Sequence, residues 1–412
     1  MFLTVSKRVE FSASRRLHVR RSSAAENLAA FGPETGARFG TGRNYVAYFV
    51  FSGEVDPTNG MLMNISEIKN RVGVVLHEKF DHKFLNEDNP DFAETPPTNE
   101  NVARQLFRDV APLFAASDAK LVACHLRESE ARSATFYGNG AADLNVWFGF
   151  SAARQTMSPH LSRAENTVRF GAAASPHGHG HNYRARLTLR ADAGASASDS
   201  IPHERISEVV DSLLRELDHK NLNHEVAALQ DRPITTESLA AFLFDRARDA
   251  RLPIARVRLF ERPDFFAEHW GEDRYFLGMQ QHFSAAHRLH SSFLSQAENL
   301  ELYGKCNNER GHGHRYLVEG TIGGVYDPRS GTLYDFEALR DGMSAALLPW
   351  QDKHLDRETE EFRARPSTGE NIVDALWPRM DCELSDRLAR LRLWETPNNR
   401  FTLRRGREAD GA

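Results

Sequence analysis

The chain has 412 residues, which exceeds the usual size of one compact core, so two to four domains are expected. Its apolar fraction of 41% and charged fraction of 26% are typical of a soluble globular protein. The net charge of −5 gives no general reason to expect a nucleic-acid partner.

The number of cysteines and the N-terminal residues indicate the cellular compartment. Cys124, Cys306 and Cys382 are too few and too scattered for a disulfide framework. The N-terminal residues turn charged before they could supply the apolar core of a signal peptide, and no stretch approaches the length of a membrane-spanning helix. We therefore expect a cytoplasmic protein without a membrane partner.

One unit occurs three times along the chain. Residues 150–166 (FSAARQTMSPHLSRAEN) and 283–299 (FSAAHRLHSSFLSQAEN) align without a gap, and residues 11–27 are a third version. Later landmarks recur in the same order: FDHKFLN (80–86), LDHKNLN (217–223) and WQDKHLD (350–356). These repeats predict three units, which we call copy one (1–140), copy two (141–272) and copy three (273–412).

Each copy has the same predicted elements in chain order. A strand carries the FSA motif, an irregular polar loop follows, and a second strand begins near residues 44, 182 and 315. A turn signal such as DPRSG (327–331) precedes a helix, predicted in copy three over 336–348. A second helix begins at a Thr/Ser-rich cap, as at 367–380, and two strands close the unit. The class is α+β and the order is ββααββ.

Such a unit leaves sheet edges open, and open edges are a liability unless they join neighbouring edges. Three fused copies can therefore close into one barrel-like ring. A single ring would explain the length of the chain without requiring three separate functions.

Copy three holds a candidate metal site. His312 and His314 are two residues apart on a strand, so both side chains emerge on one face. His287, from the FSAAH strand, reaches the same face if those two strands pair. Three neutral imidazoles with an open fourth position are typical of a catalytic zinc site. A solvated sheet face is the alternative interpretation.

Three further side chains of copy three are candidates. Cys306 lies in a loop beside Lys305 and near Arg310, and positive neighbours predict a lowered thiol pKa and a reactive thiolate. Glu370 follows a predicted helix cap, where it could merely complement the helix dipole. Glu395 ends a strand, where a carboxylate can accept two N–H bonds from a guanidine-like ligand edge.

These motifs resemble the 6-pyruvoyl-tetrahydropterin synthase family of zinc lyases, which also includes bacterial 6-carboxytetrahydropterin synthase. The resemblance covers essentially all of copy three, most of copy two and, more thinly, copy one. It implies the T-fold, in which three ββααββ units form a twelve-stranded antiparallel barrel with the helices outside and two barrels stack. One chain then equals a pseudo-trimer, and a homodimer of pseudo-trimers equals the family's hexamer.

The resemblance also implies roles for the candidate residues. It implies Zn²⁺ on His287, His312 and His314, acid/base chemistry at Cys306, and a pterin substrate held by Glu370 and Glu395. The implied reaction eliminates triphosphate from 7,8-dihydroneopterin triphosphate and isomerises its side chain. The Cys-x5-His-Gly-His spacing favours the pyruvoyl-forming branch over the carboxy-forming one.

The copies depart from the family pattern in complementary ways. The family pairs its cysteine with an Asp-His dyad of a neighbouring subunit, and copy three has Gln351-Asp352 there. The dyad is present as Asp81-His82 in copy one and Asp218-His219 in copy two, neither of which has the cysteine. We therefore expect one composite site per chain, at the seam between copy three and a neighbour.

The zinc positions are also altered in the other copies, which carry the following residues: Arg15, Thr41 and Arg43 in copy one, with Glu34 near the cysteine position, and Arg154, His179 and His181 in copy two. We expect no metal in either. Three functions stay open at this point: the pyruvoyl synthase, a carboxytetrahydropterin synthase of deazapurine synthesis, and a non-catalytic pterin-binding protein. Retro-aldol cleavage of dihydroneopterin is a related possibility.

Overall fold

The computed structural model describes residues 2–191 and 201–406. Copy one contains β1 (Phe2–Arg15), α1 (Ala24–Phe31), β2 (Thr41–Ser52), α2 (Ile65–Lys79), β3 (Lys83–Phe84), α3 (Leu85–Asp88), α4 (Asn99–Val110), β4 (Lys120–Arg127) and β5 (Arg132–Tyr137). Copy two contains β6 (Ala142–Arg154), α5 (Arg163–Phe170), β7 (His179–Ala191), α6 (His203–Leu217), β8 (Lys220–Asn221), α7 (Thr236–Asp249), β9 (Ile254–Arg262) and β10 (Phe265–His269). Copy three contains β11 (Tyr275–His287), α8 (Gln296–Tyr303), β12 (His312–Gly324), α9 (Phe336–Leu347), β13 (Lys353–His354), α10 (Leu355–Glu358), α11 (Gly369–Glu383), β14 (Leu388–Thr396) and β15 (Asn399–Arg404).

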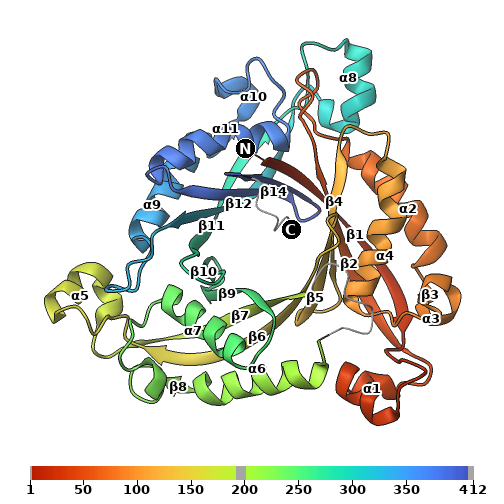
Figure 1. Cartoon of the computed structure of the whole chain (residues 1–412). Helices are drawn as coiled ribbons and strands as arrows, with labels where there is room; N and C mark the ends of the chain where they lie inside the picture. The colour runs from red at the N-terminus through yellow and green to blue at the C-terminus, as the bar shows by residue number, and fades with distance from the viewer. Residues whose placement is uncertain (1, 192–200, 407–412) are drawn as a thin grey trace.

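The strands of the three copies close into one antiparallel barrel (Figure 1). The described sheet has 15 strands, of which β3, β8 and β13 are two-residue segments beside the first strand of each copy, so the barrel wall has twelve. The copies join where β5 pairs with β6, β10 with β11, and β1 with β15. The predicted ring and the ββααββ order of long elements are confirmed.

The loop between the first two strands differs from the prediction. It was expected to be irregular, but a short helix forms there in each copy: α1, α5 and α8. Each begins with a capping box, in which a serine side chain accepts from the backbone three residues on and a glutamate reaches back. The Ser-x-x-Glu pattern, as in Ser295 and Glu298, was the overlooked signal.

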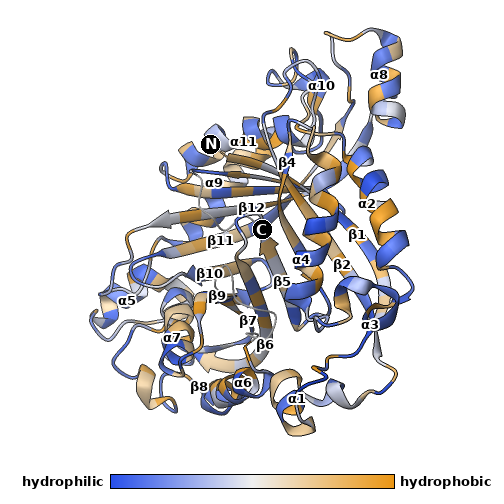
Figure 2. Ribbon diagram, turned by 45° about the vertical axis from the view of Figure 1, so that its right-hand side comes forward, coloured by the Kyte–Doolittle hydropathy of each residue, from blue (hydrophilic) through white to orange (hydrophobic). Residues whose placement is uncertain are grey.

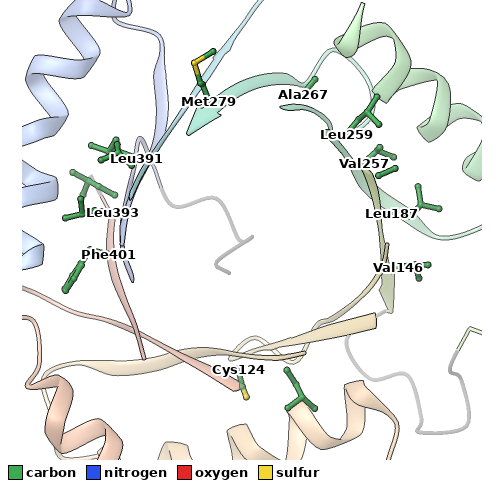
Figure 3. Close-up of a cluster of buried hydrophobic side chains, with 14 of the residues drawn as sticks. Cys124, Val146, Leu187, Val257, Leu259, Ala267, Met279, Leu391, Leu393 and Phe401 are labelled. Carbon is green, nitrogen blue, oxygen red and sulfur yellow. The ribbon is translucent and has the colours of Figure 1, made fainter. Parts of the chain in front are cut away.

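The apolar core lies between the barrel wall and the helices, not inside the barrel. The labelled side chains of Figure 3 point outward from the strands, toward the helices, and in Figure 2 helices such as α2 and α4 carry both hydrophilic and hydrophobic residues. Along β9, Val257 and Leu259 alternate with Arg256 and Arg258, so successive side chains face opposite sides of the wall. The inward face is charged, and Arg258 there donates a 2.6 Å hydrogen bond to Glu268.

No helix among the described residues is both long enough and apolar enough to cross a membrane.

We expect Gly278→Ala to destabilise the barrel where copies two and three join. Gly278 lies opposite Phe266 in the β10–β11 ladder, and a Cβ atom there would meet the Phe266 ring at 2.2 Å. Overpacking of this kind costs roughly 1–3 kcal/mol of unfolding free energy, which urea unfolding measures. Gly42→Ala is the control, because a Cβ at Gly42 meets nothing within 4 Å; equal effects of the two substitutions would contradict the prediction.

Candidate metal and pterin site

The three histidines of copy three lie together where β11 ends and β12 begins. The antiparallel register places His287 opposite His312, with His314 two residues further along the same face. The Nε2 atoms of His287 and His312 are 3.1 Å apart, and each ring offers a nitrogen within 4.8 Å of the others. The predicted pairing of these strands is confirmed, and it brings the three candidate ligands to one point.

This arrangement fits a tetrahedral divalent cation. Zn–N bonds of about 2.0–2.1 Å separate two tetrahedral ligand nitrogens by about 3.3 Å, close to the distance between His287 and His312. The Nε2 atom of His314 is buried and has no hydrogen-bond partner within the described residues. Burial, together with the neighbouring His287 and His314, lowers the pKa of His312 to about 4. That ring is therefore neutral at pH 7, as a metal ligand must be.

A hydrogen-bond network behind His287 orients its ring. Its Nδ1 lies 3.0 Å from the backbone oxygen of Ser367, which places the ring proton on Nδ1 and leaves Nε2 as the lone-pair donor. The Ser367 hydroxyl donates a 3.0 Å hydrogen bond to the Asp356 carboxylate. Asp356 was not among the predicted site residues; its sequence signal is that the other two copies have asparagine at its position.

Cys306 is half-buried in a short 3₁₀ helix (Gly304–Asn307) and forms no disulfide. The predicted lowering of the Cys306 thiol pKa is wrong. Burial raises the pKa of the Cys306 thiol, the Glu395 carboxylate raises it further, and Lys305 opposes both with a smaller effect. Sequence proximity showed Lys305, but only the fold brings Glu395 from β14 close to the thiol.

Both candidate glutamates lie near the histidine cluster: Glu395 contacts it, and Glu370 is close enough to Glu395 for the two carboxylates to interact electrostatically. The Oε1 atom of Glu395 is 3.6 Å from Nε2 of His287 and 3.8 Å from Nε2 of His314. Glu370, in the first turn of α11, is buried and accepts a 3.0 Å hydrogen bond from the backbone N–H of Leu62. Burial raises the pKa of Glu370 to about 7, against the lowering effect of the Leu62 N–H.

A turn of copy one forms part of this site. Thr368 donates a 2.5 Å hydrogen bond to the backbone oxygen of Gly60, and Tyr303 donates one of 2.6 Å to that of Asn59. Beside the β15–β1 pairing, the 58–62 turn thus brings copy one into contact with copy three at this site.

The two Asp-His dyads lie elsewhere on the chain surface. His82 Nδ1 is 3.0 Å from Asp81, His219 Nδ1 is 2.9 Å from Asp218, and both histidine side chains are 83% exposed. In the described part of the chain, no hydrogen bond or ion pair joins either dyad to copy three. The composite site within one chain therefore stays a prediction.

Arginine occupies the first histidine position in the other copies. In copy two, Arg154 contacts Glu261, the counterpart of Glu395, at 2.5 Å, and Nε2 of His181 lies 3.0 Å from the same carboxylate. His179, His181 and Glu261 are close enough to be counted as a possible ligand group.

Copy one has an ion-pair cluster in the corresponding place. Arg15 and Arg43 both contact Glu128 at 2.6 Å, and Arg43 also contacts Glu34. Glu128 and Glu261 align with Glu395, so a carboxylate recurring at the same strand position in all three copies is the sequence signal for them.

The buried glutamate of copy two is expected to make the free energy of unfolding depend on pH. Glu237, the counterpart of Glu370, is buried, and burial raises its pKa to about 7, opposed by the Leu333 N–H. A raised carboxyl pKa stabilises the fold at low pH, and this contribution is lost as pH rises from the unfolded value of 4.5 through 7. Glu237→Gln removes the titrating carboxyl group. The free energy of unfolding of this variant, minus that of the unsubstituted chain, should therefore rise by about 3 kcal/mol between pH 4 and pH 8.

Urea unfolding of both proteins at the two pH values measures this difference. Glu301→Gln, an exposed position on α8, is the control and should show no comparable change. A difference between Glu237→Gln and the unsubstituted chain that does not change with pH would contradict the prediction.

Comparison with known proteins places these features in a family. The model of the family described as 6-pyruvoyl tetrahydropterin synthase matches residues 4–139, 143–272 and 277–406. The 6-pyruvoyl tetrahydrobiopterin synthase of Drosophila melanogaster is 41% identical over 132 residues, 31% of this chain and 79% of that protein. The Homo sapiens protein of the same name is 41% identical over 119 residues, 28% of this chain and 82% of that protein. The structure of Caenorhabditis elegans 6-pyruvoyl tetrahydropterin synthase is 38% identical and aligns with a TM-score of 0.32, covering 32% of this chain and 96% of that one.

Proposed function

Because the chain belongs to the 6-pyruvoyl tetrahydropterin synthase family, we propose that it is a zinc-dependent lyase. The proposed reaction converts 7,8-dihydroneopterin triphosphate to 6-pyruvoyl-tetrahydropterin and triphosphate, at one site per chain in copy three. One observation carries the proposal: copy three alone combines a three-histidine cluster with a nearby thiol and two carboxylates.

The residues of copy three have separate roles in this proposal. Glu370 and Glu395 bind the guanidine-like edge of the pterin ring, because carboxylates accept paired N–H groups with a defined geometry. Cys306 moves a proton at the side-chain carbon. Zn²⁺ held by His287, His312 and His314 would polarise the side-chain hydroxyls.

A basic cleft beside the histidines supports an anionic substrate. A cavity of about 240 Å³ is lined by four arginines and one carboxylate, and by His354 next to the metal site; these residues are Arg288, Arg357, Arg363, Arg365 and Asp356. Guanidinium groups suit phosphate oxygens. We propose that the triphosphate of the substrate lies toward this cleft.

The dyads support a homodimer of pseudo-trimers. A catalytic Asp-His pair works best away from bulk water, yet both dyads of this chain are 83% exposed at the histidine. A second chain stacked on the first would cover them, and one dyad would then face Cys306 of the partner.

Incubation with dihydroneopterin triphosphate, with products resolved by mass, tests the proposed function. Triphosphate release with a pyruvoyl-bearing product supports it. A 6-carboxy product would instead establish the deazapurine branch, and unchanged substrate on zinc-loaded protein would favour a pterin-binding protein. The five residues between Cys306 and His312 favour the pyruvoyl product.

A further inference from the structure

Asp356 lies in the basic cleft of copy three, where its charge does not suit a phosphate ligand. It is the one carboxylate beside the four arginines that line the cleft, and a carboxylate repels phosphate oxygens. Its Oδ2 atom already has two partners. It accepts a 2.7 Å hydrogen bond from the backbone N–H of Arg288 and a 3.0 Å hydrogen bond from the Ser367 hydroxyl. These bonds point to a role other than contact with the substrate.

Both hydrogen bonds of Asp356 lead to the candidate metal ligand His287. Arg288 directly follows His287, the last residue of β11. The backbone oxygen of Ser367 lies 3.0 Å from Nδ1 of His287, and the Ser367 hydroxyl lies 3.4 Å from the same atom. His287 and Ser367 are fully buried, so bulk water cannot replace these contacts. The carboxylate therefore fixes the imidazole both through the strand that carries it and through the group that accepts its proton.

The corresponding residues of the other copies make a different pattern. Asn86 accepts from the backbone N–H of Arg16 at 2.7 Å and donates to the backbone oxygen of the same residue at 3.0 Å. Asn223 does the same with Gln155, at 2.8 and 3.0 Å. A carboxylate has no proton to donate to a backbone oxygen. Asp356 instead accepts twice, and its second donor is a side chain of another segment.

The serine is also confined to copy three. The aligned segments PTNEN (97–101), ITTES (234–238) and STGEN (367–371) place Pro97 and Ile234 at the position of Ser367, and neither has a hydroxyl. The backbone oxygen of Pro97 nevertheless accepts a 2.8 Å hydrogen bond from Arg15, which stands at the position of His287. The backbone acceptor is thus common to copies one and three, whereas the carboxylate and the hydroxyl occur only with the histidine.

We propose that Asp356 and Ser367 are positioning residues that set how tightly the copy-three histidines bind a divalent cation. This inference rests on the metal site of the proposed function and identifies the groups that strengthen it. A carboxylate that holds the acceptor of the Nδ1 proton keeps Nε2 of His287 directed toward the metal. Its negative charge also offsets part of the charge of the cation. Copies one and two lack this support as well as the first histidine.

The zinc affinity of the full chain, measured by competition with a chromophoric chelator, tests the proposal. In Asp356→Asn the side chain can still accept from Arg288, as Asn86 does from Arg16, but the negative charge is lost. We expect the Kd for zinc to rise about 10- to 100-fold, the usual cost of losing a group behind a metal-ligating histidine. Asn86→Asp makes the reverse change at the same position of copy one and should leave the zinc affinity unchanged.

Ser367→Ala is the second variant, and it removes the hydroxyl that links Asp356 to the acceptor of the His287 proton. It should weaken zinc binding to a similar extent. Because the two side chains act through one hydrogen bond, the losses should not multiply in the double variant. Cobalt(II) in place of zinc gives an independent measurement, since its visible absorption depends on the coordination geometry. At saturating cobalt we expect a changed spectrum for Asp356→Asn and an unchanged one for Asn86→Asp.

The possible failures of this inference and of the proposed function are distinct. If the unsubstituted chain binds zinc and Asp356→Asn binds it equally well with the same cobalt spectrum, the inference is overturned and the proposed function stands. Equal weakening by Asp356→Asn and Asn86→Asp would indicate a general effect on the barrel and would also overturn the inference. An unsubstituted chain that binds no zinc would overturn both.

Discussion

Replacing His314 with alanine is expected to abolish metal binding and turnover together while leaving the barrel folded. Among the described residues the buried Nε2 atom of His314 has no hydrogen-bond partner, and its loss would remove one of the three proposed protein ligands. The apolar core that holds the barrel together extends along all three copies between strands and helices, so we expect the barrel to stay folded without the His314 ring. Metal analysis should fall from near one zinc per chain to near none, with an unchanged circular dichroism spectrum.

The matched control for this experiment is His181→Ala in copy two. His181 occupies the position of His314, but its Nε2 lies 3.0 Å from Glu261, which is already held by Arg154. We expect the His181 variant to keep its single zinc. Two or more zinc equivalents in the unsubstituted chain, or loss of zinc from the His181 variant, would contradict the assignment of one site per chain.

Loss of the dyad histidine that serves Cys306 is expected to lower turnover by about 10²–10⁴, the range for lost acid/base help. His82→Ala and His219→Ala, made separately, should differ strongly in turnover, because only one dyad can face the thiol. Cys306→Ala should be inactive. If both histidine variants keep full activity, a partner within copy three is required, and His354, which lies beside His287 and Gly311, is the candidate.

A mixing experiment shows whether the dyad acts within one chain or between two. A chain with Cys306→Ala keeps its dyads, and a chain with His82→Ala and His219→Ala keeps its thiol. If the dyad comes from the partner, co-refolded mixtures regain activity, because the intact thiol of one chain meets an intact dyad of the other. If the dyad acts within its own chain, every site in the mixture lacks one group and the mixture stays inactive.

The sequence by itself determined the repeat, the order of elements and the candidate metal ligands. Alternation along strands and the His-x-His spacing are local patterns with a physical period of two, so they can be read without neighbours. The Ser-x-x-Glu pattern that begins α1, α5 and α8 is equally local, and each of the three capping boxes is complete. These helices were nevertheless not predicted.

Only the tertiary structure decided which groups surround those ligands. Glu395 comes from β14 and reverses the expected pKa direction of Cys306, and Asp356 and Ser367 come from separate segments to orient His287. The seams likewise rest on backbone groups of the 58–62 and 327–333 turns, and the sequence predicts turns there but not which segments they contact. Burial and Coulomb interactions depend on distance in space. Closing the barrel brings together residues that are far apart in the chain, so local sequence patterns do not show which groups interact.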